Sequence, residues 1–172
     1  MTDPDRRLHD RTRDALDTLR VAYEVLECDP TLADTAAFVA AYGVPAAQSA
    51  NTIVVVGKGA EPRYVACVLL ATTSLDVNGA VRREIGVRKA SFAAADPVRE
   101  LTDMEIGGVT PFGLPDDLPI LVDSRVMAPD WIVLGGGNRS SKLRLAPGTL
   151  SALASIRIVE ALAVERASTS PT

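Results

Sequence analysis

Two glycine-rich segments are the parts of this sequence best suited to hold a ligand against the main chain. They cover residues 107–113, with the sequence GGVTPFG, and residues 135–139, with the sequence GGGNR. Glycine adopts backbone conformations closed to other residues and lets a ligand approach main-chain N–H groups closely. Such N–H groups can bind a phosphate or a developing oxyanion. Both segments are therefore candidate binding loops.

Each segment also has a plainer interpretation. The second one joins two expected strands, and a simple hairpin turn explains it equally well. It is neither a dinucleotide fingerprint, because no helix follows it, nor a phosphate-binding Walker loop. The first one combines three glycines, a proline and an aromatic residue in seven positions. Ordered loops of this kind beside a rigid sheet often carry function, which favours a site.

Other candidate side chains are few. Asp123 ends an expected strand, where its carboxylate could either face a pocket or cap the next turn. The single histidine, His9, excludes sites built on histidine pairs, and its charged neighbours indicate a solvated helix face. Cys28 and Cys67 form neither a disulfide framework nor a metal cluster, and we expect both to pack as small apolar residues.

Composition indicates one globular domain. The chain has 172 residues, of which 47% are hydrophobic and 23% charged, and its formal net charge is −4. All of that charge falls in residues 1–34, while the remainder is neutral with basic clusters around residues 82–89 and 139–144. This balance excludes a long nucleic-acid footprint but permits a small phosphate contact. The charged start, the lack of a long apolar run and the cysteine content predict a cytoplasmic protein with no membrane association.

Helical and strand patterns alternate along the chain. We expect helices over residues 6–19, 36–42 and 78–85, a helix opened by Asp96-Pro97, and a last helix over residues 150–156. The expected strands are residues 23–27, 52–56, 64–70, 89–93, 119–123, 131–134 and 143–145. Strands outnumber a simple βαβ rhythm. We therefore predict a single α/β domain over residues 1–166, with a mixed, strongly curved sheet and helices packed outside, followed by a flexible tail at 167–172.

Several segments together resemble the YbaK/EbsC-like aminoacyl-tRNA deacylases, relatives of the editing domain inserted in bacterial prolyl-tRNA synthetases. The resemblance runs from about residue 36 to residue 161. It is carried, in order, by TAA at 35–37, YGV at 42–44, NTIVV at 51–55, RKASFA at 88–93, LT at 101–102, GGVTPFG at 107–113, PILVD at 119–123, the glycines at 135–137, LRL at 143–145 and Pro147. The glycine–proline–phenylalanine–glycine loop is the most specific of these motifs.

The resemblance implies a mixed sheet folded into an incomplete barrel and an activity without metal or cofactor. That activity is hydrolysis, in trans, of the ester joining a wrong amino acid to tRNA. The family usually carries a lysine, central to activity, immediately before the Thr-hydrophobic strand. Here that position holds Asn51, and Lys58 should lie some 20 Å away past the strand. Asparagine keeps a hydrogen-bond donor but loses the positive charge.

The resemblance and the loops together assign expected roles. Loop N–H groups would hold the carbonyl oxygen while a water, activated by a hydroxyl of the terminal ribose, attacks. A pocket shaped by Val109 and Phe112 would select a small amino acid by size. The expected catalytic residues are Asn51, Gly107 and Gly108. The expected substrate-binding residues are Val109, Thr110, Pro111, Phe112, Gly113, Asp123, Gly136, Gly137 and Arg139. The expected tRNA contacts are Arg82, Arg83, Lys89 and Lys142.

Two functions remain open at this point. One is an editing deacylase acting on the acceptor end of an aminoacyl-tRNA, with an aminoacyl-tRNA synthetase as a candidate second partner. The other is a catalytically weak or inactive binding module on the same fold, motivated by Asn51. Both are compatible with a monomer or a homodimer. We predict that Asn51, both glycine-rich segments and Asp123 converge on one concave pocket.

Overall fold

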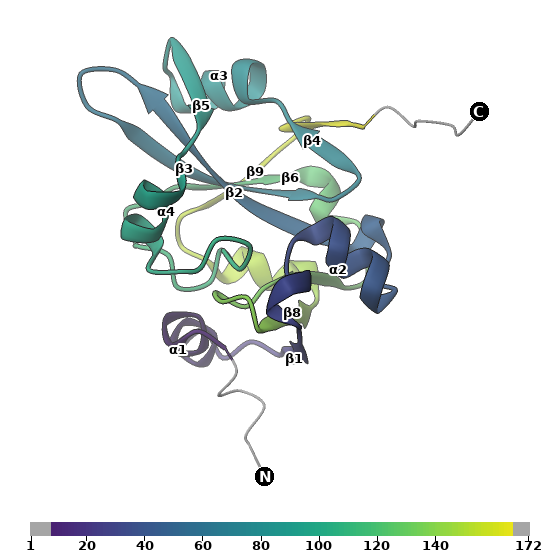
Figure 1. The fold of residues 1–172 in the computed structure, drawn as a ribbon. Coiled ribbons are helices and arrows are strands. Elements are labelled where there is room, and N and C mark those ends of the chain that lie inside the picture. Colours follow the sequence, from purple (N-terminus) through teal and green to yellow (C-terminus); the bar gives the residue numbers. More distant parts are fainter. Residues whose placement is uncertain (1–7, 167–172) are drawn as a thin grey trace.

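A long β-hairpin is the central element of the fold. In the computed structural model, which describes residues 8–166, strands β2 and β3 pair antiparallel over most of their length (Figure 1). β5 extends this pair on one side antiparallel to β2, and β6 and β9 extend it on the other side as parallel strands, giving the order β5-β2-β3-β6-β9. The strands are β2 (Ala50–Lys58), β3 (Arg63–Leu70), β5 (Lys89–Phe92), β6 (Ile120–Asp123) and β9 (Ile156–Val159).

A second, three-stranded antiparallel sheet packs against the first. It comprises β1 (Glu24–Glu27), β8 (Ser141–Leu145) and β7 (Ile132–Gly135), with β8 in the middle. A single parallel bridge between Ser49 and Val133 joins the two sheets just before β2 begins. A further pair, β4 (Thr73–Leu75) with β10 (Ala163–Glu165), forms a separate two-stranded sheet. The predicted mixed α/β architecture is confirmed, and the sheets do not close into a barrel.

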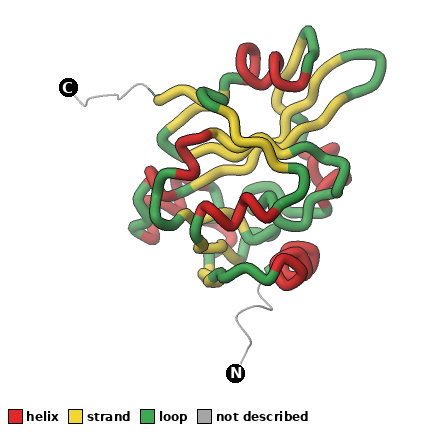
Figure 2. The backbone as a smooth tube through the Cα atoms, turned by 180° about the vertical axis from the view of Figure 1, so that it is seen from behind, coloured by secondary structure: helices red, strands yellow, loops and turns green. Residues whose placement is uncertain are grey.

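Short helices cover the sheets from outside (Figure 2). The α-helices are α1 (Asp10–Leu19), α2 (Thr35–Tyr42), α3 (Arg82–Ile85) and α4 (Ala95–Thr102). The shorter helical turns are η2 (Pro30–Leu32), η3 (Ala46–Gln48), η4 (Val77–Val81), η5 (Ser124–Met127) and η6 (Pro147–Ala152). None of the helices within residues 8–166 combines the length and apolar character needed to cross a membrane.

The apolar core has two main parts, one on each face of the five-stranded sheet. Val68, Ile120 and Leu143 belong to the larger part, between the two sheets and α1. Cys67 and Val81 belong to the other part, beneath η4. Burial raises the pKa of the Cys67 thiol to about 12, so this cysteine is protonated and packs as an apolar group, as predicted.

Three features of the secondary structure differ from the sequence-based expectation. The last helix is wrong: a 3-10 helix ends at Ala152, and residues 156–159 extend as β9 because β6 offers them a parallel partner. Three strands, β4, β9 and β10, were not predicted. Each has only three or four residues, too few to show a clear alternation of apolar and polar side chains. Helix α4 begins before Asp96, so Pro97 lies in its first turn, where its missing N–H has no helical acceptor. The predicted tail at 167–172 lies outside the described residues.

Asp123 is a buried structural carboxylate. It is fully buried at the end of β6, where one oxygen accepts from the backbone N–H of Arg125 at 3.0 Å and the other from that of Ala163 at 2.9 Å. The Arg125 guanidinium lies 3.4 Å from the carboxylate. Of the two interpretations of Asp123, capping the next turn is the observed one.

The two glycine-rich segments interlock through their main chains. The N–H of Gly137 donates to the carbonyl of Gly108 at 2.7 Å, and the N–H of Glu105 donates to the carbonyl of Gly137 at 3.1 Å. A Cβ on Gly135 would lie 2.5 Å from the Gly108 carbonyl oxygen, and one on Gly108 would collide with the main chain of Asn138. Close approach of the two loops therefore requires glycine at these positions.

Substitution of Gly108 by alanine tests this interlock. Because the added Cβ meets backbone atoms that cannot swing away, Gly108→Ala should lower the free energy of unfolding by about 2 kcal/mol. Urea denaturation followed by circular dichroism measures the change. Gly148→Ala is the matched control: nothing lies within 4 Å of its added Cβ, so its effect should stay within about 0.5 kcal/mol. Equal stability of the two variants would contradict the interlock.

Candidate active site

A cleft opens where the two sheets meet. Its volume is about 290 Å³, and it lies beside the start of β2, close to the bridge between Ser49 and Val133. The segments that line it come from α2, β2, the end of β5, α4, the first glycine-rich loop, β7 and β8. The lining residues are Asp34, Thr35, Ala50, Asn51, Thr52, Ile53, Val54, Phe92, Ala93, Val98, Ile106, Gly107, Val109, Gly135 and Lys142.

Asn51 is oriented by the start of helix α2. The Thr35 hydroxyl donates to the Asn51 side-chain oxygen, so the amide N–H groups are the donors that Asn51 can offer to a ligand. The next hydroxyl along the strand, that of Thr52, is buried with no hydrogen-bond partner among the described residues. The buried hydroxyls of Thr12 and Thr110, which do not line the cleft, are in the same state, so this feature is not specific to the cleft.

Lys142 enters the same cleft from β8. The residue is only 6% exposed, and its Nζ donates to the carbonyl of Ala33 at 2.7 Å and to that of Gly107 at 3.4 Å. The ammonium also lies 5.2 Å from the centre of the Phe38 ring. Burial lowers the pKa of Lys142; nearby Arg139 lowers it further, while Cys28 and Asp34 act in the opposite direction.

Arg139 holds the rim of the cleft together. Its Nε donates to the Pro30 carbonyl at 2.9 Å, and its Nη1 reaches the Ile106 carbonyl at 2.9 Å and an Asp34 carboxylate oxygen at 3.2 Å. The Arg139 backbone N–H donates to the Glu105 carboxylate at 2.7 Å. These contacts tie the second glycine-rich loop to the segment that precedes α2. They place Arg139 beside the cleft, bonded to the protein itself.

The loop N–H groups expected to hold an oxyanion are partly engaged within the protein. The Gly108 N–H donates to the Glu105 carbonyl at 2.9 Å, and the Gly137 N–H donates to Gly108. The carbonyl of Gly107, which lines the cleft, accepts from Lys142. An oxyanion site formed by Gly108 and Gly137 N–H groups therefore does not fit this structure.

The predicted convergence on one pocket is correct for Asn51, Gly107, Val109 and Gly135, and wrong for most other members of the set. Thr110 and Phe112 are fully buried, Phe112 in the larger core, because the loop turns inward after Val109. Pro111 and Gly113 face α1, where Gly113 approaches the main chain of Arg11. The remaining members outside the lining of the cleft are Gly108, Asp123, Gly136, Gly137 and Arg139.

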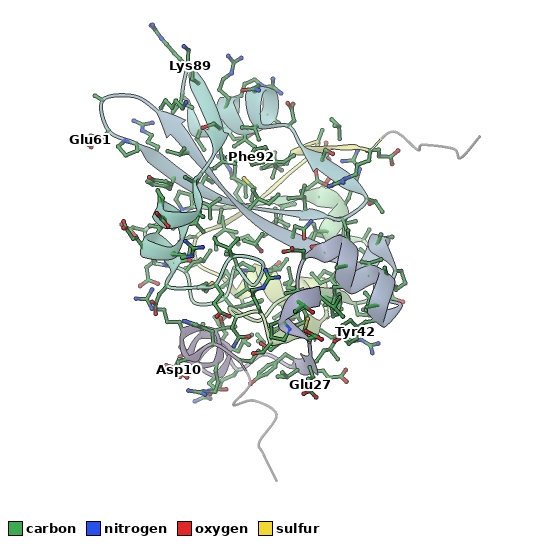
Figure 3. The ribbon with its side chains drawn as sticks, viewed as in Figure 1. Asp10, Glu27, Tyr42, Glu61, Lys89 and Phe92 are labelled. Carbon is green, nitrogen blue, oxygen red and sulfur yellow. The ribbon has the colours of Figure 1, made fainter. Side chains whose placement is uncertain are left out.

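The four residues expected to contact tRNA do not lie together. Arg83 and Lys89 are exposed and Arg82 is half-buried, all near the far end of the β2–β3 hairpin, where Lys89 pairs with Lys58. Figure 3 shows Lys89 and Glu61 at that end, away from Asp10 and Tyr42. Lys142 is buried in the cleft and lies apart from these three residues, so it does not belong to one exposed basic surface with them.

Sequence reasoning assigned no site role to Asp34, Thr35, Thr52 or Phe92, which all line the cleft, and it listed Lys142 as a tRNA contact without placing it there. The β8 sequence SKLRL alternates, which puts Lys142 and Arg144 on the face opposite Leu143. Arg144 stacks 4.2 Å from the Trp131 ring centre, whereas Lys142 is covered by α2 and the first glycine-rich loop. The alternation alone gives no sign of this difference, because both covering segments are distant in sequence.

Comparison with known proteins agrees with this architecture. Residues 29–153 match the aminoacyl-tRNA editing domain family. A solved structure of a protein whose proposed role is trans-editing for prolyl tRNA synthetase is similar with a TM-score of 0.74 and 25% identity, covering 93% of this chain and 97% of that one. A hypothetical protein shares the fold with a TM-score of 0.77 and 23% identity, covering 87% of this chain and 97% of that one. The chain therefore belongs to the aminoacyl-tRNA editing domain family.

Proposed function

We propose that this protein is an aminoacyl-tRNA deacylase that hydrolyses, in trans, the ester between tRNA and a wrongly attached small amino acid. The family membership and the similarity to a protein with a proposed trans-editing role support this activity. The observation that carries it is the cleft at the start of β2, which combines Asn51, Thr52 and Lys142 with an apolar wall. At about 290 Å³ it is at the lower end of small-ligand sites, as a small aminoacyl group requires.

The lining suits an ester that needs little chemical activation. It contains no serine, cysteine or histidine, and two of its other nucleophilic groups, the Thr35 hydroxyl and the Lys142 ammonium, already donate hydrogen bonds within the protein, which favours water as the attacking group. Asn51 and the unpartnered Thr52 hydroxyl can orient the ester or the terminal ribose. Asp34, the one acidic residue of the lining, is suited to the α-ammonium group that every aminoacyl ester carries.

A second candidate is a binding module without turnover. It is favoured by Asn51, because an amide held by Thr35 offers hydrogen bonds but no charge at the start of β2. Such a module would retain an aminoacyl-tRNA end without accelerating its hydrolysis. The two candidates share the cleft and differ only in the rate of ester loss.

A panel of mischarged tRNAs separates the two candidates. We expect at least one pairing with a small amino acid to lose its ester at least about tenfold faster than in buffer, and Asn51→Ala to reduce that gain about tenfold. Asn78→Ala, an exposed change in η4, is the control and should keep the wild-type rate. If no pairing is accelerated but a hydrolysis-resistant analogue binds, the second candidate is correct.

The path of the tRNA end follows β5. Phe92 lines the cleft, yet 59% of it is exposed, an unusual exposure for a large aromatic side chain. Exposed aromatic rings of this kind stack on unpaired bases. Three residues earlier, about 10 Å along the strand, Lys89 begins the basic end of the hairpin. We propose that the terminal base stacks on Phe92 and that phosphates farther along contact this basic end.

Removal of the Phe92 ring tests the stacking contact. Phe92→Ala should raise KM for the aminoacyl-tRNA about tenfold and leave kcat nearly unchanged, since a stacked base adds equally to ground-state and transition-state binding. Ile158→Ala removes an apolar side chain of similar exposure, 47%, on the strand at the opposite edge of the sheet. That control should keep the wild-type KM, and an equal effect of both changes would contradict the assignment.

Charge reversal tests the basic end. With few phosphates contacted, log K against log salt should have a shallow slope, about −0.7 for each single-stranded contact. Lys89→Glu should weaken binding and make the slope shallower by at least about 0.7, the value of one contact. Arg20→Glu, an exposed change at the end of α1, should leave the slope as it is. A wild-type slope near −10 would require a footprint larger than this surface offers.

A further inference from the structure

Lys142 is a buried cation without an acidic partner. Among residues 8–166 no carboxylate oxygen lies within 4.0 Å of its Nζ, and the two oxygens that it contacts are carbonyls. A charge removed from water without a counter-charge is costly, so such groups are rarely kept for stability alone. Retention of an unpaired ammonium in a cleft is typical of functional sites.

The contacts of Lys142 also leave it capacity for a ligand. An ammonium has three N–H donors, and the structure pairs it with the Ala33 and Gly107 carbonyls, the second at a long 3.4 Å. These two bonds tie the side chain to the segment before α2 and to the first glycine-rich loop. Its position is therefore set by rigid main chain, as a preorganised electrostatic group requires.

Lys142 and Asn51 face one cleft from different sheets. In β7, Gly135 pairs directly with Lys142, and Gly135 has no side chain to separate that lysine from the cleft. Asn51 lies two residues beyond Ser49, the residue that bridges to β7. The site thus has an amide on the β2 side and an ammonium on the β8 side.

We propose that the Lys142 ammonium binds the carbonyl oxygen of the aminoacyl ester and stabilises the negative charge that develops there during hydrolysis. Water attacks the carbonyl carbon and the C=O electron pair moves onto that oxygen beside Nζ. The C–O bond to the ribose then breaks as the carbonyl re-forms. The ribose oxygen takes up one proton of the attacking water. The remaining hydroxyl group of that water stays on the carbonyl carbon and becomes part of the free carboxyl group. This inference rests on the deacylase function proposed above.

Lys142→Met tests the role of the charge. Methionine keeps a similar length and apolar stem, so the melting temperature should change by no more than about 4 °C. We expect kcat to fall about 100-fold with little change in KM, the pattern for an interaction made mainly in the transition state. Arg144→Met, two residues along the same strand on the surface, is the control and should keep the wild-type kcat.

A second variant separates charge from tethering. Asn51→Lys in the Lys142→Met background supplies an ammonium from β2 but no link between Ala33 and Gly107, and it should regain at least tenfold of the lost kcat. If kcat does not rise in this double variant, its fall in Lys142→Met is due to the lost link between Ala33 and Gly107 rather than to the lost charge, and the proposal is overturned. Wild-type kcat in Lys142→Met would also overturn it, as would loss of the folded state in both Lys142→Met and Lys142→Gln. If the wild-type protein hydrolyses no ester, the proposed function itself fails, and this inference with it.

Discussion

The close main-chain contact between the two glycine-rich loops is the constraint on which the rest of the site depends. The bonds from Gly137 to Gly108 and from Glu105 to Gly137 bring a loop that follows α4 against a loop that joins β7 to β8. Without side chains at these positions, the first loop can cross the end of β7 closely enough for its Gly107 carbonyl to meet Lys142. The cleft is the space left between this crossing and the start of β2.

Electrostatics inside the cleft follows from that packing. The loop, α2 and β8 enclose the Lys142 ammonium and exclude water from most of it, so its field acts over short distances with little screening. Arg139, by contrast, donates its side-chain hydrogen bonds to two carbonyls and to Asp34, and so links segments at the rim of the cleft. Two basic residues three positions apart thus have different surroundings, and only one of them faces the cleft.

Much of the fold could be predicted from local pattern. The β-branched run of β2, the turn that leads into β3, and the Asp34-Thr35 start and Gly43 end of α2 are signals that a few neighbouring residues carry. β9 was not predicted, and the last helix was predicted to run too far, to residue 156, because the pairing of β9 with β6 is decided by a strand more than thirty residues away. Within the site, Asn51, Gly107 and Val109 were identified through motifs, whereas Phe112 and Asp123 were placed wrongly. An aromatic ring and a carboxylate both suit a pocket, but here Phe112 packs in the core and Asp123 accepts backbone hydrogen bonds in the interior.

By itself, the sequence determined the α/β class, the central hairpin, the two glycine-rich loops and the departure at Asn51, because these depend on residue type and near neighbours. Only the tertiary structure decided which side of those loops faces a ligand. It also decided that Lys142 lies inside the cleft, whereas Arg144, two residues on, lies on the surface. The physical reason is that burial of a side chain depends on what packs over it. Here the covering groups, the Ala33 carbonyl and the Gly107 loop, come from segments 109 and 35 residues away in the chain.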